Sequence, residues 1–296
     1  MCRMRRKRYT LVSPPSCSCV RAMTPRIYCI PDPQSRVAAV LERRPRKWWR
    51  VGRWDLISGA YSAGAWFRGS LYPQRCDLSP GGRWFLYFAL KSQSDWPAGE
   101  TYTAVSRLPW LKALVAWREI GTWSRGAHFV LTGGEWELGE PTVGDASPCR
   151  AVIGVRRSEA AQFAVERRRG WIESADTPTR GSNDVWDERR TVVMKKVQPV
   201  AGASLVLSVR GMFEAFRESP DSRPPLPAPY RLHRKRDVEE LPGVQWADWT
   251  STGRLATATA TVLSLRDVKR NRTISEFALP QDEPQRCPPP DWASEW

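Results

Sequence analysis

The chain has 296 residues, enough for one large all-β domain or two smaller domains, so its size excludes a mini-protein held together mainly by disulfides. It carries 46 Lys and Arg against 31 Asp and Glu, a formal net charge of +15, and its 16 Trp are spread from Trp48 to Trp296. The seven cysteines form no CxxC pair and have no neighbouring histidine, which excludes a zinc ribbon, and no run of about 20 apolar residues predicts a membrane helix.

The N-terminal segment, residues 1–22, contains six Arg and Lys, no acid and no periodic pattern. We interpret residues 1–24 as a basic disordered tail. A translation start at Met23 is the alternative, because strand-like sequence begins at Arg26. The apolar stretch after the basic start is too short and too broken by proline for a signal peptide, so we expect a cytoplasmic protein.

From Arg26 onward, short β-type runs alternate with turns rich in Gly, Pro, Ser and Asp, which favours a sandwich, barrel or propeller over βαβ units. Residues 158–169 are a candidate helix, and the Pro-rich stretches 177–183 and 218–229 are predicted loops or linkers. The predicted strands are 26–30, 36–41, 47–56, 83–90, 102–106, 113–117, 128–131, 151–155, 191–197, 204–209 and 255–265.

Two pairs of segments indicate internal repeats. Residues 64–72 and 121–129 share the pattern G-x-W-x-R-G, and residues 77–83 and 248–254 share D-x-x-x-x-G-R before a β-type run. Each repeat would then correspond to one supersecondary unit that packs on its neighbours.

The second pair also predicts turn chemistry. We expect Asp77 and Asp248 to accept backbone N–H bonds in Asx-type turns, and Gly82 and Gly253 to take the positive φ that a reversal requires. The run after the first turn, WFLYFAL, is apolar at every position, so it predicts a strand covered on both faces.

The stretch DLSPGGRWFLYFA resembles the turn-and-strand signature of WD40 and TolB-type propeller blades, and Trp54-Asp55 resembles the dipeptide that ends a WD40 strand. The chain also resembles a group of uncharacterised, Trp-rich, propeller-like bacterial proteins. The resemblance implies an all-β, irregular β-propeller of four to six blades with at most one short helix. We expect it to span residues 25–275 and to be followed by a Pro-rich C-terminal tail, 276–296.

That resemblance implies a non-catalytic scaffold for a protein partner, and two alternatives stay open. In the first, Asp77 and Asp248 form the acid pair of a small glycosidase-like hydrolase, which needs two carboxyls about 5–9.5 Å apart. His128 and His233 are the only histidines, so a His-based triad or a multi-His metal site is disfavoured. We therefore predict no catalytic, cofactor-binding or metal-binding residue and lean against an enzyme.

The second alternative is a basic module that associates with nucleic acid. The candidate surface comprises Arg46, Lys47, Trp48, Trp49 and Arg50, whose cations and indoles would grip phosphates and stack on bases. The same residues are also explained by one Trp packing inward while the other lies on a blade edge, with the basic side chains reaching to solvent.

Overall fold

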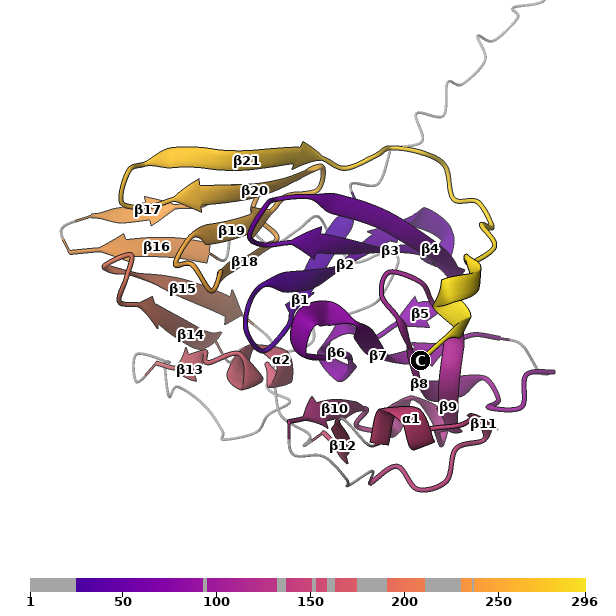
Figure 1. Cartoon of the computed structure of the whole chain (residues 1–296). Helices are drawn as coiled ribbons and strands as arrows, with labels where there is room; N and C mark the ends of the chain where they lie inside the picture. The colour runs from indigo at the N-terminus through magenta and orange to yellow at the C-terminus, as the bar shows by residue number, and fades with distance from the viewer. Residues whose placement is uncertain are drawn as a thin grey trace, which may run out of the picture.

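The computed structural model describes residues 25–92, 95–131, 137–150, 153–158, 163–174, 191–210, 230–235 and 237–296, and it is built largely from antiparallel strands (Figure 1). The all-β class is confirmed. The predicted tail at 1–24 and the predicted linkers at 177–183 and 218–229 lie outside the described residues.

The strands of the described residues form five antiparallel sheets, which we name A to E in chain order. Sheet A contains β1 (Arg26–Pro31), β2 (Val37–Arg44), β3 (Trp48–Asp55) and β4 (Tyr61–Arg68). Sheet B contains β5 (Ser70–Leu71), β6 (Asp77–Leu78), β7 (Trp84–Leu90), β8 (Thr101–Arg107), β9 (Ala113–Arg118) and β11 (Val143–Gly144), and sheet C contains β10 (Ala127–Val130) and β12 (Gly154–Arg157). Sheet D contains β13 (Ile172–Glu173), β14 (Thr191–Gln198), β15 (Ala203–Arg210), β16 (Tyr230–Arg234) and β17 (Val238–Glu240), and sheet E contains β18 (Trp246–Trp249), β19 (Leu255–Ala258), β20 (Val262–Asp267) and β21 (Arg272–Ala278).

In the described part of the chain, helical structure is confined to short segments. The two α-helices are α1 (Ser147–Arg150) and α2 (Ala164–Arg168), so the helix predicted at 158–169 is limited among the described residues to its second half. The single-turn 3₁₀ helices are η1 (Pro45–Lys47), η2 (Pro73–Arg75), η3 (Pro80–Gly82), η4 (Gly121–Trp123) and η5 (Asp291–Ser294).

The sheets pack face to face through four clusters of buried apolar side chains. These clusters join sheet A to B, B to C, A to E and D to E. The first and last sheets of the chain are therefore neighbours, as in a propeller, whose blades follow one another around a ring. Between sheets C and D lies the segment 163–174: Phe163 and Trp171 join the D/E cluster, and Val165 joins the A/B cluster (Figure 1).

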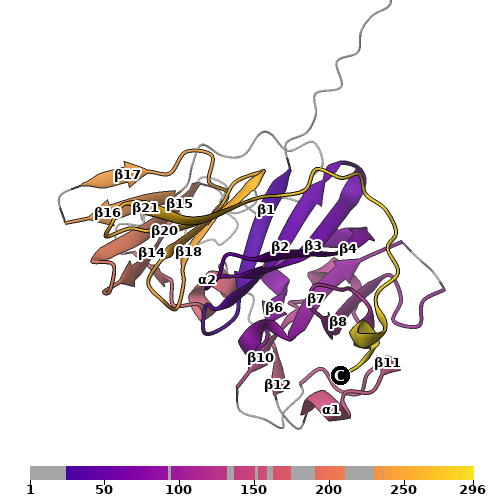
Figure 2. The same cartoon turned by 45° about the horizontal axis from the view of Figure 1, so that its top comes forward.

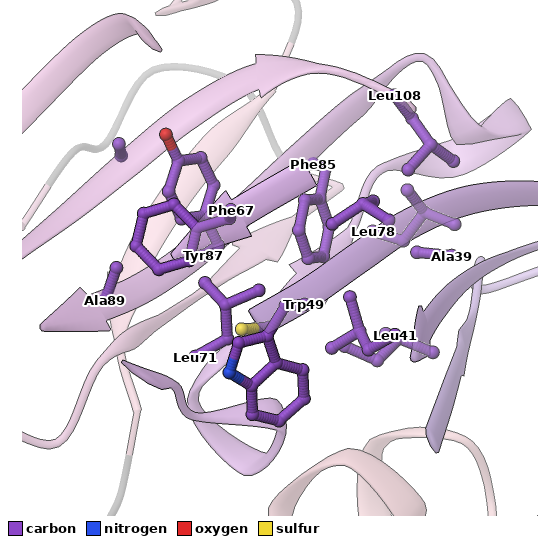
Figure 3. Packing of buried hydrophobic residues seen from close by; sticks show 14 of the residues in the cluster. Ala39, Leu41, Trp49, Phe67, Leu71, Leu78, Phe85, Tyr87, Ala89 and Leu108 are labelled. Atoms are coloured by element: carbon purple, nitrogen blue, oxygen red, sulfur yellow. The ribbon is translucent and has the colours of Figure 1, made fainter. Parts of the chain in front are cut away.

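The continuous apolar run WFLYFAL forms strand β7, which is covered by a neighbouring sheet on each face. Phe85 and Tyr87 point into the A/B cluster, which Figure 3 shows around Trp49, whereas Trp84 and Leu86 point into the B/C cluster. Because successive strand residues face opposite sides, a strand with a sheet packed on each side must be apolar throughout.

Two features of the chain differ from the sequence interpretation. Residues 255–265 form two strands, β19 and β20, because the Thr259 hydroxyl accepts the N–H of Val262 (3.0 Å) and closes a turn between them. The G-x-W-x-R-G pair is not a structural repeat, since Gly64 lies within β4 and Gly121 begins η4.

The C-terminal segment, 276–296, packs against the sheets over part of its length. Residues 276–278 belong to β21, and the chain then passes the end of sheet A and runs down beside β8 (Figures 1 and 2). Leu279 is buried in the A/E cluster, Ala293 is buried, and the Trp296 ring lies edge-on to Trp84 at a centroid distance of 6.5 Å.

Candidate binding site at the end of sheet A

Gly82 lies in the β6–β7 turn and Gly253 in the β18–β19 turn. Their φ angles are 68° and 75°, and each donates its N–H to a carbonyl oxygen three residues earlier, at Ser79 and Thr250 (2.9 Å in both turns). The hydroxyls of these two residues each accept one further backbone N–H. The two turns therefore share the bond from the glycine N–H, whereas the hydroxyl bond differs: Ser79 accepts the N–H of Trp84, and Thr250 accepts the N–H of Arg254, one position closer.

A third turn of this kind joins β1 to β2 and was missed in the sequence. Ser35, with φ of 53°, donates its N–H to the carbonyl of Asp32 (2.9 Å), whose carboxylate accepts the N–H groups of Arg36 (2.6 Å) and Val37 (3.0 Å). A serine replaces the expected glycine at the positive-φ position. The remaining signal is the Arg that follows this position in all three turns.

Asp77 does not cap its own turn. Its side chain is buried, its Oδ1 accepts from Arg169 Nη2 (2.6 Å), and its Oδ2 accepts from the N–H of Phe129 in β10 (2.9 Å). The expected Asx-type turn is absent at this residue because Ser79, two positions further on, occupies the capping position. The Asp77 carboxylate instead ties sheet B to sheet C and to the segment after α2.

Asp248 also bridges two sheets. It is 3% exposed in β18, and its Oδ1 accepts from Lys196 Nζ in β14 (2.6 Å) and from the N–H of Trp249 (2.7 Å). Asp77 and Asp248 are thus each paired with a different cation, on a different element.

A buried acid that the sequence interpretation did not single out lies in α2. Glu166 accepts from the Tyr28 hydroxyl (2.8 Å) and from the amide of Gln74 (3.0 Å). Burial raises the pKa of the Glu166 carboxyl, although the hydrogen bonds from Tyr28 and Gln74 act in the opposite direction. No sequence pattern marked this group, because its partners come from β1 and η2.

An exposed basic and aromatic surface lies at one end of sheet A. Strand pairing places two cross-strand rows on the same face of β2, β3 and β4, and we call their basic and aromatic members the Arg–Trp face. The Arg–Trp face consists of Arg44, Trp48, Arg50, Trp66 and Arg68.

The Arg–Trp face is internally ordered by ring and cation contacts. The Arg50 guanidinium lies 5.1 Å from the Trp66 ring centroid, and the Arg68 guanidinium lies 5.9 Å from that of Trp48. The two indoles meet edge to face at 6.4 Å and 89°. Both remain partly exposed, and Arg68 is exposed, so the surface is available to a partner.

Of the five residues predicted from sequence, the structure brings Trp48 and Arg50 together on this face. Trp49 points to the other side of the sheet, is 4% exposed, and belongs to the A/B cluster. Arg46 and Lys47 lie at the exposed tip of the β2–β3 hairpin with φ angles of 59° and 61°, an uncommon conformation for side-chain-bearing residues. Because successive strand residues face opposite sides of a sheet, the alternation along β3 alone predicts that Trp49 lies on the face opposite Trp48 and Arg50.

The Arg–Trp face already holds one acidic segment of the chain itself. The buried Arg50 side chain donates to Glu42 (2.7 Å) and to Asp282 (2.7 Å), which follows β21. Arg44 donates to the Gln281 side chain (3.1 Å) and the Pro280 carbonyl (3.1 Å).

Among the described residues, no group of three or more His, Cys, Asp or Glu is placed to hold a metal ion, and no helix is long and apolar enough to cross a membrane. The Arg–Trp face is the candidate functional site on the basis of its exposed Arg68 and its partly exposed indoles.

Comparisons with known proteins give limited information. No family model and no curated protein matches the chain. Solved structures that are similar include an uncharacterised protein of Listeria monocytogenes, at 8% identity, TM-score 0.27, and coverage of 86% of this chain and 85% of that one. Others are Saccharomyces cerevisiae Sqt1, at 8% identity, TM-score 0.24 and coverage of 87% and 76%, and the WD40 domain of fission yeast SCAP, at 9%, 0.24, and 87% and 57%.

Proposed function

We propose that this chain is a non-catalytic, propeller-like scaffold that binds an acidic segment of a protein partner at the Arg–Trp face. The observation that carries the proposal is the combination of the partly exposed Trp48 and Trp66 indoles with the exposed Arg68 at the end of sheet A. Trp and Arg are the residues that dominate protein interfaces when they are preorganised.

Charge complementarity indicates the chemistry of the partner. Asp282 of the chain's own C-terminal segment pairs with Arg50 within this surface (2.7 Å), which supports a partner that carries carboxylates. Arg68 has an exposed side chain beside the same indoles, and Arg46 and Lys47 extend the positive charge to the hairpin tip. An acidic peptide would therefore meet several further cations.

The ring geometry favours a protein over single-stranded nucleic acid. Stacking of successive bases requires accessible indole faces. One face of Trp48 is covered by Arg68, one face of Trp66 is covered by Arg50, and the two rings are perpendicular. The ion pairs of Asp77 and Asp248 likewise support a structural role for these residues, and we propose that role for Gly82 and Gly253 as well.

The experiment is a fluorescence anisotropy titration with a labelled Glu-rich peptide and with a labelled single-stranded oligonucleotide of matched charge. We expect the peptide to bind more tightly, and Trp48→Ala to weaken it by about 30-fold, the equivalent of a 2 kcal/mol interface residue. Trp292→Ala is the matched control, because Trp292 is also exposed and also stacks on an arginine, Arg107, at 5.4 Å.

Tighter binding of the oligonucleotide, lost in Trp48→Ala, would refute the protein-partner proposal in favour of nucleic acid. Equal losses in Trp48→Ala and Trp292→Ala would show that the Arg–Trp face is not the binding site.

A further inference from the structure

A second basic site lies on sheet D, at the end of the sheet that carries the β14–β15 and β16–β17 turns. The Arg–Trp face, by contrast, belongs to sheet A. A shallow, open cleft of about 340 Å³ lies beside the β14–β15 and β16–β17 turns. Its polar and apolar lining includes Lys195, Val197, Ser204, His233, Arg234 and Lys235.

Strand register explains why these side chains converge. Val197 pairs with Ser204, and Ser204 pairs with His233, so the three form one row across β14, β15 and β16. Lys195 lies two residues before Val197 and therefore on the same face. Lys235 comes from the adjoining turn, so the two ammonium groups approach the row from different elements.

The charges of the cleft are positive and incompletely balanced. Arg234 is paired with Glu239 (2.6 Å), and Glu239 is shared with Arg266. In the part of the chain that the structure describes, the exposed Lys195 and Lys235 ammonium groups form no ion pair.

The neighbouring groups do not supply an alternative partner. Glu240 is paired with Arg231 (2.7 Å), and Asp237, in the same turn as Lys235, is not part of the lining. His233 Nε2 is buried and has no hydrogen-bond partner among the described residues. A buried polar atom without a partner is costly unless a ligand or water satisfies it.

We propose that this cleft binds a small phosphomonoester. Two ammonium groups match the charge of a phosphate dianion, and the Ser204 hydroxyl and His233 ring add donors around its tetrahedral oxygens. Val197, which lies in the lining and is 62% exposed, offers apolar surface to the organic group of the ester.

The test is isothermal titration calorimetry of the whole chain with phenyl phosphate, inorganic phosphate and benzoate at constant ionic strength. We expect phenyl phosphate to bind most tightly, because it presents both the dianion and an apolar ring. Replacing the cations in Lys195→Gln/Lys235→Gln should weaken phenyl phosphate by about tenfold or more through loss of charge-assisted hydrogen bonds.

The matched control is Lys269→Gln, which removes an exposed lysine from the β20–β21 turn of sheet E and should leave binding unchanged. Circular dichroism spectra and melting temperatures establish that the variants are folded. The single substitution His233→Gln should also weaken phenyl phosphate and keeps the test informative if the double variant does not fold.

Several outcomes would overturn the proposal: no binding of phenyl phosphate, equal binding of benzoate, or the same loss in Lys269→Gln. The site is independent of the proposed function, since Trp48→Ala should weaken peptide binding by about 30-fold and leave phenyl phosphate binding intact.

Discussion

Replacement of Asp77 by alanine should destabilise the protein far more than loss of a turn cap would. The carboxylate is buried and paired with Arg169, whose side chain is only 5% exposed, at 2.6 Å. Removing one partner of a buried ion pair typically costs about 3–5 kcal/mol, because the other charge stays buried without compensation. Loss of an ordinary capping bond costs about 1 kcal/mol.

Two further bonds bear on that magnitude. Arg169 also donates to the carbonyl of Pro31 (2.7 Å), which partly compensates its charge, whereas the N–H of Phe129 would lose its acceptor. An unsatisfied buried donor costs about 1–3 kcal/mol. Since these effects act in opposite directions, we keep the expectation at about 3–5 kcal/mol in the free energy of unfolding.

The assay is urea unfolding followed by tryptophan fluorescence, with Asp55→Ala as the matched control. The Asp55 carboxylate caps its own turn by accepting the N–H groups of Ile57 (3.0 Å) and Ser58 (2.8 Å), so its loss should cost about 1 kcal/mol. In a double-mutant cycle, Asp77→Ala and Arg169→Met should be non-additive. Equal costs for Asp77→Ala and Asp55→Ala would refute the cross-sheet role of Asp77.

Three further predictions concern other buried contacts. Arg50→Met should increase hydrogen exchange in the C-terminal segment that Arg50 holds, whereas Arg270→Gln, at an exposed pair, should not. Burial raises the pKa of Glu166, so the stability that its protonated form provides at low pH is lost as pH rises from the unfolded-state pKa through the raised folded-state pKa. The stability of Glu166→Gln relative to wild type, measured by urea unfolding, should therefore grow over that pH range. A constant difference would contradict this. Gly82→Ala should lower the melting temperature more than Gly81→Ala: both have positive φ, but only at Gly82 would a new Cβ meet a valine side chain, at 2.6 Å.

The parts of the fold that depend on local pattern could be predicted from sequence. The apolar run of β7 required two covering sheets, and the short strands separated by turn residues indicated antiparallel sheets. The span 255–265 was read as one strand because Thr is a good strand residue, and the turn made by the Thr259 hydroxyl leaves no distinct pattern.

The site could be predicted only in part, because its members are joined by pairing between distant strands. Trp48 and Arg50 stood in one conspicuous run, but Trp66 and Arg68 enter through the register of β3 with β4. The local sequence around Asp77 likewise predicts a turn cap, because the partner of its carboxylate, Arg169, lies 92 positions away in the chain.

The most direct test of the proposed function is the hydrogen-exchange footprint of the Glu-rich peptide on the intact chain. We expect slower exchange in residues 44–50 and 66–70 when the peptide is bound, and no such change in Trp48→Ala. Protection confined to other sheets, or a footprint that persists in Trp48→Ala, would contradict the assignment of partner binding to the Arg–Trp face.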